Sequence, residues 1–248
     1  MKKKTEKKRK IVVVMPAYCA AATLGDVIDR VSKKDMERIY KVIIVNDGSI
    51  DKTREVALSL KKRYGKIQLI DHETNKGYGA AQKTGYRQAL KDGADIIILL
   101  HSDGQYAPEL MLELTKPIEE GKADVVMGSR MLIKGGALKG NMPLYKYIGN
   151  RFLTFCENLA YGMNLSEYHS GYMLYSRKAL ETIPIEKLSN TFHFDGEMLI
   201  VSGKKGLRVV EMPIPTRYAG EKSHLNPIKY GLDVFRVIFR NFMGKYNF

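Results

Sequence analysis

Mostly apolar runs of three to five residues alternate along the chain with longer segments that carry a helical pattern. The runs that predict strands cover 11–15, 42–45, 67–70, 96–100 and 125–127. The segments that favour helices cover 22–31, 52–64, 79–91 and 108–119. Apolar runs of this kind are typical of strands buried on both faces of a sheet, and their alternation with helices indicates right-handed βαβ units. The pattern predicts one α/β domain with a mostly parallel central sheet and flanking helices.

The strand predicted at 96–100 is followed directly by residues with metal-binding chemistry, His101, Asp103 and Gln105. Because side chains alternate across a strand, an extended chain would point all three the same way, at the edge where open α/β sheets place ligands. A carboxylate and an amide oxygen suit Mg²⁺ or Mn²⁺, and an imidazole favours Mn²⁺. A plain surface turn after a core strand is the alternative that this stretch alone leaves open.

The other predicted strands also end in polar, aromatic or cationic residues. The segments that follow them are Pro16-Ala17-Tyr18, Asn46-Asp47-Gly48-Ser49, Asn75-Lys76-Gly77-Tyr78-Gly79 and Gly128-Ser129-Arg130. The third of these precedes a predicted helix, whose N-terminus suits an anion. Since the carboxyl ends of parallel strands share one edge, these segments predict a binding site there.

The chain is strongly basic, with a net charge of +14. Seven Lys or Arg and one Glu among the first ten residues supply +6 of it, which leaves +8 for the rest. This charge calls for an anionic partner, such as nucleic acid, acidic lipid or a phosphorylated substrate. We expect residues 1–10 to form a disordered tail and not a secretory signal, since no long apolar region follows them. Two cysteines give no disulfide framework, and no apolar run approaches the roughly 20 residues that a membrane-spanning helix needs.

Taken together, these segments resemble the inverting glycosyltransferases of family 2, which have the GT-A fold. The resemblance covers about residues 11–225 and is closest to the dolichyl- and polyprenyl-phosphate sugar transferases of the dolichol-phosphate mannose synthase type. The matching segments are 14–18, 45–49, 75–81, 102–105, 128–130 and 170–177. Each segment is weak evidence alone, but the ordered set is specific.

The resemblance implies a nucleotide-sugar site. Its residues would be Pro16, Ala17, Tyr18, Asp47, Lys76, Ser102 and Asp103. Asp47 would accept hydrogen bonds from a base N–H or from ribose hydroxyls, and the alternative for it is an Asx-turn cap. The family commonly has Asn-Glu after Pro-Ala-Tyr, whereas this chain has Cys19-Ala20, so both uridine and guanosine donors stay open.

The resemblance also implies a divalent cofactor, Mg²⁺ or Mn²⁺. Asp103 would bind the ion, with Gln105 as a second ligand. His101 stands where the family commonly has an acidic residue, and it would either ligate the ion or pack beside the ligands. The ion would stabilise the charge that develops on the departing nucleoside diphosphate.

Basic residues on the acceptor side are implied to bind phosphate. They are Arg130, Lys146, Arg217 and Lys222, and the catalytic residues would be Asp103, Arg130 and Asp195. Asp195 and Glu197 would lie near the cleft, where a carboxylate serves as base in relatives with hydroxyl acceptors. A phosphate acceptor is already an anion, so Asp195 would then hold a loop or a basic side chain instead.

The implied function is that of an enzyme, a metal-dependent inverting glycosyltransferase. It would move one sugar from a GDP- or UDP-sugar to a polyprenyl or dolichyl phosphate, as a peripheral protein on the cytoplasmic face of a membrane. Its partners would be the donor, the lipid acceptor and the membrane surface, with a second copy or a separate membrane subunit, and not nucleic acid. The alternatives are a family 2 enzyme acting on a saccharide or protein hydroxyl and, more remotely, a non-catalytic basic adaptor for RNA or membranes.

The last segment, 226–248, predicts an amphipathic helix after the catalytic domain. Its apolar positions recur at helical spacing: Ile228, Leu232, Phe235, Phe239 and Phe242. Lys229, Arg236, Arg240 and Lys245 add positive charge, which only Asp233 opposes. Such a helix can lie in a membrane interface, and the alternatives are packing on the domain's own core or a subunit contact.

Overall fold

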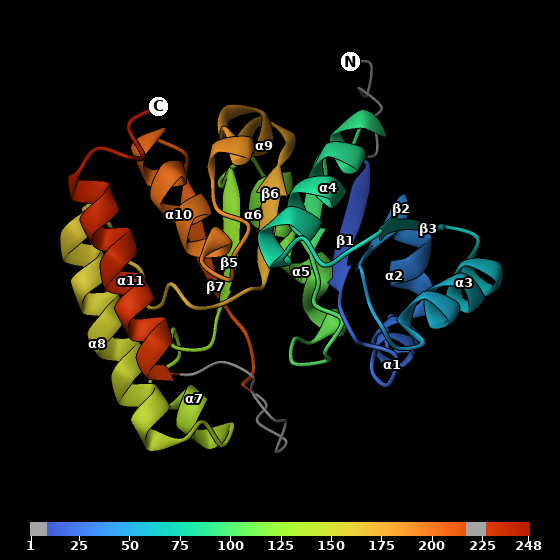
Figure 1. The fold of residues 1–248 in the computed structure, drawn as a ribbon, viewed down its shortest axis with the longest axis horizontal. Coiled ribbons are helices and arrows are strands. Elements are labelled where there is room, and N and C mark those ends of the chain that lie inside the picture. The colour runs from blue at the N-terminus through green and yellow to red at the C-terminus, as the bar shows by residue number, and fades with distance from the viewer. Residues whose placement is uncertain (1–8, 217–226) are drawn as a thin grey trace, which may run out of the picture.

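The computed structural model describes residues 9–216 and 227–248. Its centre is a seven-stranded sheet in the order β3-β2-β1-β4-β6-β5-β7 (Figure 1). The strands are β1 (Ile11–Ala17), β2 (Lys41–Asp47), β3 (Ile67–His72), β4 (Ile96–Leu99), β5 (Val125–Ser129), β6 (Met173–Ser176) and β7 (Val209–Pro213). Only β6 runs antiparallel to its neighbours, β4 and β5. The predicted α/β fold with a mostly parallel sheet is confirmed.

Helices cover both faces of the sheet (Figure 1). They are α1 (Leu24–Asp29), α2 (Lys33–Arg38), α3 (Thr53–Tyr64), α4 (Tyr78–Lys91), α5 (Met111–Leu114), α6 (Lys116–Glu119), α7 (Gly136–Lys139), α8 (Leu144–Tyr161), α9 (Arg177–Thr182), α10 (Phe194–Lys204) and α11 (Pro227–Phe242). The helix predicted over 108–119 is divided into a 3₁₀ turn (Pro108–Leu110), α5 and α6. Pro117 has no N–H to continue the α5 ladder, which accounts for this break.

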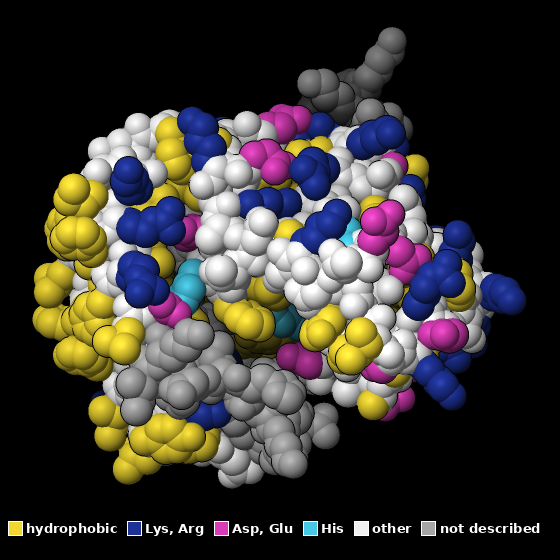
Figure 2. All heavy atoms as spheres, in the orientation of Figure 1, with side chains coloured by type: hydrophobic (Ala, Val, Ile, Leu, Met, Phe, Trp, Pro, Cys, Tyr) yellow, Lys and Arg dark blue, Asp and Glu magenta, His cyan; other side chains and the backbone are white. Residues whose placement is uncertain are grey.

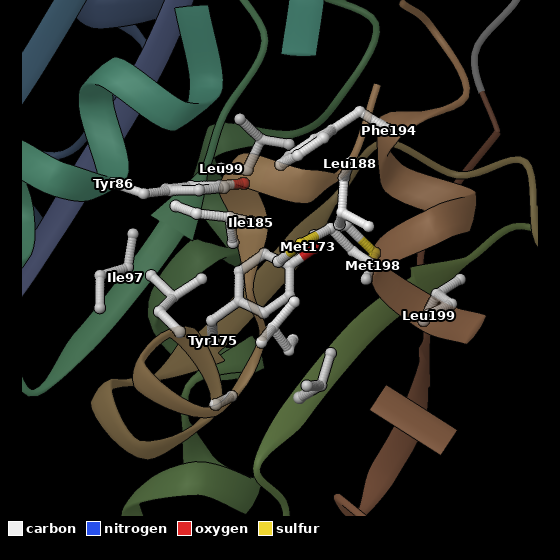
Figure 3. Close-up of a cluster of buried hydrophobic side chains, with 14 of the residues drawn as sticks. Tyr86, Ile97, Leu99, Met173, Tyr175, Ile185, Leu188, Phe194, Met198 and Leu199 are labelled. Atoms are coloured by element: carbon white, nitrogen blue, oxygen red, sulfur yellow. The ribbon is translucent and has the colours of Figure 1, made fainter. Parts of the chain in front are cut away.

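Two apolar layers hold the helices on the sheet. Val12 and Val14 of β1 face one layer, while Ile11, Val13 and Met15 face the other, as the alternation of a strand requires. Figure 3 shows the first layer, in which Tyr86 of α4 and Tyr175 of β6 meet with ring centroids 5.5 Å apart. Burial on both faces explains why the strands are apolar throughout.

Glycine lets α4 lie close against β1. A Cβ atom on Gly85 would overlap Cγ1 of Val14, so a larger residue there would push the helix away from the sheet. Because α4 begins at Tyr78, directly after the loop that follows β3, this close packing also fixes where Tyr78 stands. The position of one functional side chain thus depends on a glycine two turns along its helix.

The last helix, α11, lies beside α8 (Figure 1). It buries Val234, Val237 and Ile238, and Nδ2 of Asn241 donates to the carbonyl of Ala160 at 3.1 Å. The packed face of α11 is therefore different from the predicted apolar row, whose described members Leu232, Phe235, Phe239 and Phe242 are exposed. No helix in the described part of the chain is both long and apolar enough to cross a bilayer.

Candidate active site

A cavity of about 760 Å³ opens at the carboxyl ends of β1, β2 and β4, and Figure 2 shows the surface hollowed near the middle of this face. Eleven of the fourteen predicted site residues line it: Pro16, Ala17, Tyr18, Asp47, His101, Ser102, Asp103, Gln105, Arg130, Lys146 and Asp195. Residues from α4, α8, α10 and α11 complete the walls. The strand ends therefore meet in one place, as their order along the chain indicates.

Of the three other predicted residues, only Lys76 lies in the described part of the chain. The side chain of Lys76 is exposed and is not part of the described cavity lining, although its backbone N–H donates to Oδ1 of Asp47 at 2.9 Å. Arg217 and Lys222 lie outside the described residues. The cationic character of the described lining comes from Arg130 and Lys146.

The segment after β4 is a turn and not an extended strand. The strand ends at Leu99, Gly104 has a left-handed φ of +78°, and Oδ1 of Asp103 accepts from the backbone N–H of Gln105 at 3.0 Å. The expectation of strand alternation through residue 105 is therefore wrong, because an Asx turn reverses the chain there. His101, Asp103 and Gln105 nevertheless all line the cavity.

The donor set in this turn fits a divalent ion that shares its coordination with a substrate. Asp103 is exposed to the cavity, and among the described residues it accepts only through Oδ1. The described residues hold no group of three or more His, Cys, Asp or Glu side chains that could enclose a metal. Mg²⁺ is commonly held by one or two carboxylates together with substrate phosphates, so a single exposed Asp is a suitable protein ligand.

A hydrogen-bonded chain runs from His101 into the interior. The hydroxyl of Tyr78 donates to Oδ2 of Asp195 at 2.7 Å and lies 2.8 Å from Nε2 of His101. Since that hydroxyl has one proton, Nε2–H of His101 must donate to the Tyr78 oxygen. Nδ1 of a neutral His101 ring then carries the lone pair.

Burial sets the proton affinities in this chain. Burial raises the pKa of Asp195, although hydrogen bonds from Tyr78 and Gln82 oppose the shift. Burial and the neighbouring Asp195 carboxylate raise the pKa of Tyr78 well above its usual value. Gln82 donates to Oδ1 of Asp195 at 2.9 Å, so both carboxylate oxygens already have protein donors.

Asp47 organises the loop that follows β3. Its Oδ1 accepts from Lys76 N–H and lies 2.6 Å from Nδ1 of His72, while its Oδ2 accepts from Gly77 N–H at 2.9 Å. Asp47 is 3% exposed and lines the cavity. These contacts cap a neighbouring loop, so the carboxylate has a structural task beside any contact with a ligand.

Ser102 links the ends of β1 and β4 beneath the cavity. Its hydroxyl donates to the carbonyl of Pro16 at 3.0 Å, and its own carbonyl accepts from the hydroxyl of Thr23 at 2.7 Å. The side chain is buried. Ser102 thus joins the ends of β1 and β4, which places Tyr18 and Asp103 on one floor.

Arg130 is held by a buried glutamate. Nη2 of Arg130 donates to Oε2 of Glu167 and to the carbonyl of His169, both at 2.7 Å. Burial would raise the pKa of Glu167, but the Arg130 charge and its hydrogen bonds outweigh this and lower it overall. A guanidinium fixed from behind in this way offers a preset cation to the cavity.

Sequence reasoning missed several residues of the lining. They are Tyr106, Tyr145, Asn150, His169, Phe192 and Tyr230, and the buried partner Glu167 was missed as well, while Tyr78 belongs to the predicted segment 75–79 but had no role predicted for it. One usable signal existed, because Ser166 to Gly171 is a polar run directly before β6. The others reach the site through long-range packing, which periodicity does not report.

Comparison with known proteins decides the family. The family model described as "Glycosyl transferase family 2" matches residues 12–184, which is more than half of the chain. The chain belongs to glycosyltransferase family 2. The matched region contains most of the cavity lining, from Pro16 to Gly171.

Relatives of this glycosyltransferase match it over nearly its whole length. An uncharacterized protein of Methanocaldococcus jannaschii is 34% identical over 241 residues, covering 96% of this chain and 93% of its own length. The UDP-N-acetylglucosamine–dolichyl-phosphate N-acetylglucosaminyltransferase of Methanococcus voltae is 30% identical over 248 residues, covering 95% and 97%. The enzyme also resembles the crystal structure of glucosyl-3-phosphoglycerate synthase from Mycobacterium tuberculosis with Mn²⁺, UDP and phosphoglyceric acid. That match has a TM-score of 0.67 at 18% identity over 96% of this chain and 78% of the other, and it supports the fold.

Proposed function

We propose that this glycosyltransferase moves one sugar from a nucleotide-sugar, UDP- or GDP-linked, to a polyprenyl or dolichyl phosphate at the cytoplasmic face of a membrane. The observation that carries the proposal is the state of the carboxylates that line the cavity. They are Asp47, Asp103 and Asp195 in the described residues. A hydroxyl acceptor needs a catalytic base, whereas a phosphate acceptor does not.

Two of the three carboxylates are already engaged by hydrogen-bond donors of the protein. Asp47 accepts three hydrogen bonds from the protein, and Asp195 is buried with a donor on each oxygen. Asp103 is the candidate metal ligand. Glu197 accepts from the Ser189 N–H at 2.6 Å and from the Tyr246 hydroxyl at 2.7 Å, and it is not among the described lining residues. This pattern suits an acceptor that arrives as an anion.

The described cations suit the same acceptor. Arg130 and Lys146 both line the cavity, on the side away from Pro16 and Asp47. In the proposed reaction an oxygen of the acceptor phosphate attacks the anomeric carbon, and the bond from that carbon to the nucleoside diphosphate breaks with its electron pair. Direct attack inverts the anomeric configuration. Arg130 and Lys146 would hold the attacking phosphate in line.

A divalent ion, Mg²⁺ or Mn²⁺, completes the proposal. Asp103 would hold it, with Gln105 as a second ligand and His101 as either a ligand through Nδ1 or a neighbour. The bound ion supplies charge neutralisation for the diphosphate that leaves. Pro16, Ala17 and Tyr18 would form the nucleoside end of the donor site, where Tyr18 has half of its side chain exposed for stacking.

Two relatives support the lipid acceptor. The Methanococcus voltae enzyme is named for transfer to dolichyl phosphate, and a 27% identical protein of Micrococcus luteus is named undecaprenyl-phosphate mannosyltransferase. In the runner-up function, transfer to a saccharide or protein hydroxyl, Asp195 could act as the base only by leaving its hydrogen bonds. A phosphate acceptor requires no such change.

The test is a matrix of donors and acceptors with the purified protein. UDP- and GDP-sugars are screened for thermal stabilisation with Mg²⁺ or Mn²⁺, since a ligand of the native state raises its melting temperature. Donors that bind are then assayed with a water-soluble, short-chain prenyl phosphate and with the matching prenyl alcohol. Transfer to the phosphate alone supports the proposal. Transfer to the alcohol or to a sugar hydroxyl at comparable rates would replace it with the runner-up.

A further inference from the structure

Exposed apolar side chains gather on two neighbouring helices. Eighteen large apolar side chains are exposed in the described part of the chain, and eleven of them belong to α8, α11 or the residue after α11. We call this surface the α8–α11 face: Leu144, Tyr145, Ile148, Phe152, Phe155, Leu159, Leu232, Phe235, Phe239, Phe242 and Met243. Figure 2 shows hydrophobic side chains gathered along the left edge of the molecule, where α8 and α11 lie in Figure 1. Soluble monomers rarely expose so large an apolar surface without a partner.

The two helices form one surface. Phe152 of α8 and Phe235 of α11 lie with their ring centroids 6.4 Å apart. The exposed positions of α8 repeat every three or four residues from Leu144 to Leu159, so they form one stripe along its length. Side chains of this face are 43–72% exposed, which leaves most of their apolar area in contact with solvent.

This surface is not an unfinished core, because both helices already pack through other positions. Thr154 and Glu157 of α8 are buried, and α11 buries Val234, Val237 and Ile238. The orientation of each helix is therefore fixed by the domain. The α8–α11 face is what remains for an external partner.

The face is continuous with the mouth of the cavity. Tyr145 belongs to the face and also lines the cavity, and the next residue, Lys146, is one of the two described cations of the lining. Gly149 and Leu153 line the cavity one and two turns further along α8. One side of α8 thus faces the phosphate end of the proposed acceptor while the adjacent side is apolar and exposed.

The charges beside the face are basic. Arg151, Arg236 and Lys245 are exposed on or directly after the two helices. Two acidic residues lie on these helices: Glu157 is buried 3.2 Å from His169, and Asp233 accepts from Arg236 at 2.6 Å, so Arg151 and Lys245 carry the basic character of the exposed surface. Apolar side chains flanked by cations match the boundary between acyl chains and acidic headgroups.

We propose that the α8–α11 face docks on an anionic lipid bilayer, with α8 and α11 lying side by side in the interface and the cavity opening at that surface. The inference rests on the proposed function for its acceptor, since a polyprenyl phosphate presents its phosphate at headgroup depth and its chain among the lipids. It adds α8 to the membrane contact and fixes which side of the domain meets the bilayer. A second copy of the chain is the competing occupant, but it would supply neither the acidic surface nor the acceptor.

The experiment measures binding to vesicles of phosphatidylcholine, with and without phosphatidylglycerol, by co-sedimentation of the full chain. We compare Phe155→Glu on α8 and Phe239→Glu on α11 with Ile50→Glu. Ile50 follows β2 on the other side of the molecule and is 89% exposed, so its variant controls for the added charge. Each face variant should lose roughly tenfold or more in vesicle partitioning, since burying one Phe side chain is worth at least that factor. Ile50→Glu should bind as the wild type does.

Activity assays separate this inference from the proposed function. The face variants should keep transfer to a short, water-soluble prenyl phosphate and lose transfer to polyprenyl phosphate held in vesicles. If no form of the protein transfers to either acceptor but the face variants still lose vesicle binding, the proposed acceptor is wrong and the docking surface stands. If Phe155→Glu lowers the melting temperature, Leu159→Glu replaces it.

Three results would overturn the inference. The first is wild-type protein that does not bind anionic vesicles. The second is Phe155→Glu and Phe239→Glu binding as tightly as Ile50→Glu. The third is a wild-type dimer in light scattering that becomes a monomer in both face variants, which would assign the face to a second copy of the chain.

Discussion

The phenol of Tyr78 joins His101 to Asp195. It lies 2.8 Å from Nε2 of the histidine at the cavity wall and donates at 2.7 Å to a carboxylate that is 6% exposed. Three residues from distant parts of the chain therefore act as one unit. Asp195 stands at the buried end of this unit and supports His101 through Tyr78.

Tyr78→Phe should therefore destabilise the protein in a pH-dependent way. Asp195 has a raised pKa in the folded state, so the stability it contributes is present at low pH and is lost as pH rises through that pKa. Without the Tyr78 donor the pKa rises further, and the loss should be about 1–3 kcal/mol near neutral pH and smaller in acid. Urea unfolding of wild type and variant from pH 4 to pH 8 measures this difference. An equal loss at every pH would mean that the carboxylate does not depend on Tyr78.

Gly171→Ala should displace His101. A Cβ atom at position 171 would overlap Nε2 of His101 and lie 2.7 Å from its Cε1. The ring must move, and it then loses its contact with Tyr78. We expect a cost of about 1–3 kcal/mol from overpacking and at least a tenfold fall in turnover. Gly25→Ala in α1 is the control, because nothing lies within 4 Å of its added Cβ, and this variant should match or exceed wild-type stability.

Asp103→Asn should leave the fold intact and remove most turnover. Asp103 is exposed and its Oδ1 contact with Gln105 N–H survives in the amide, so the melting temperature should stay within experimental error. The lost charge should lower turnover by roughly 10²-fold or more and weaken stabilisation by Mn²⁺ with nucleotide-sugar. Asp26→Asn, an exposed aspartate of α1, is the matched control. Wild-type turnover of Asp103→Asn at limiting metal would exclude the metal assignment.

Glu167→Gln should cost far more stability than the loss of a surface pair. Glu167 is fully buried, and removing its charge breaks a buried ion pair with Arg130, at a cost of about 3 kcal/mol. The pKa of Glu167 is lowered in the folded state, so this contribution is present above about pH 4.5 and is lost in more acidic solution. The control is Glu181→Gln, which breaks the exposed pair with Arg177 and should cost less than about 0.5 kcal/mol. Equal losses of stability in the two variants at pH 7 would show that the Arg130–Glu167 pair contributes no more than an exposed ion pair.

Local patterns were sufficient for the part of the molecule from β1 to β5. The strands from β1 to β5 and the loops after them follow from apolar runs and from the polar residues that end each run. Ser102 and Asp103 could be placed at the sheet edge on this basis alone. The geometry of the turn could not, because Gly104 and the Asx contact of Asp103 reverse the chain where alternation assumes an extended strand.

The part of the site that follows β5 was harder to predict because its contacts are distant in sequence. Glu167 meets Arg130 across 37 positions, and Tyr78 meets Asp195 across 117. Neither pairing produces a periodic pattern in the sequence. Helix α8 was missed for a further reason, since its apolar positions are on the exposed stripe and its buried positions include Thr154 and Glu157. A pattern that assigns apolar residues to the core gives no guidance for such a helix.

The antiparallel direction of β6 sets the segment between β5 and β6 apart from the rest of the sheet. Because β6 runs against β4 and β5, the chain can leave the sheet after β5, build α7 and α8, and re-enter at Met173 beside the turn that holds Asp103. Residues 130–172 therefore form an insertion whose two ends are held by the neighbouring strands β5 and β6. Under the proposed function this segment carries Arg130 and Lys146, whereas the proposed donor residues follow β1, β2 and β4, so the acceptor contacts and the donor contacts could be exchanged separately. Chimeras of family members joined at the end of β5 and the start of β6 would put that modularity to use.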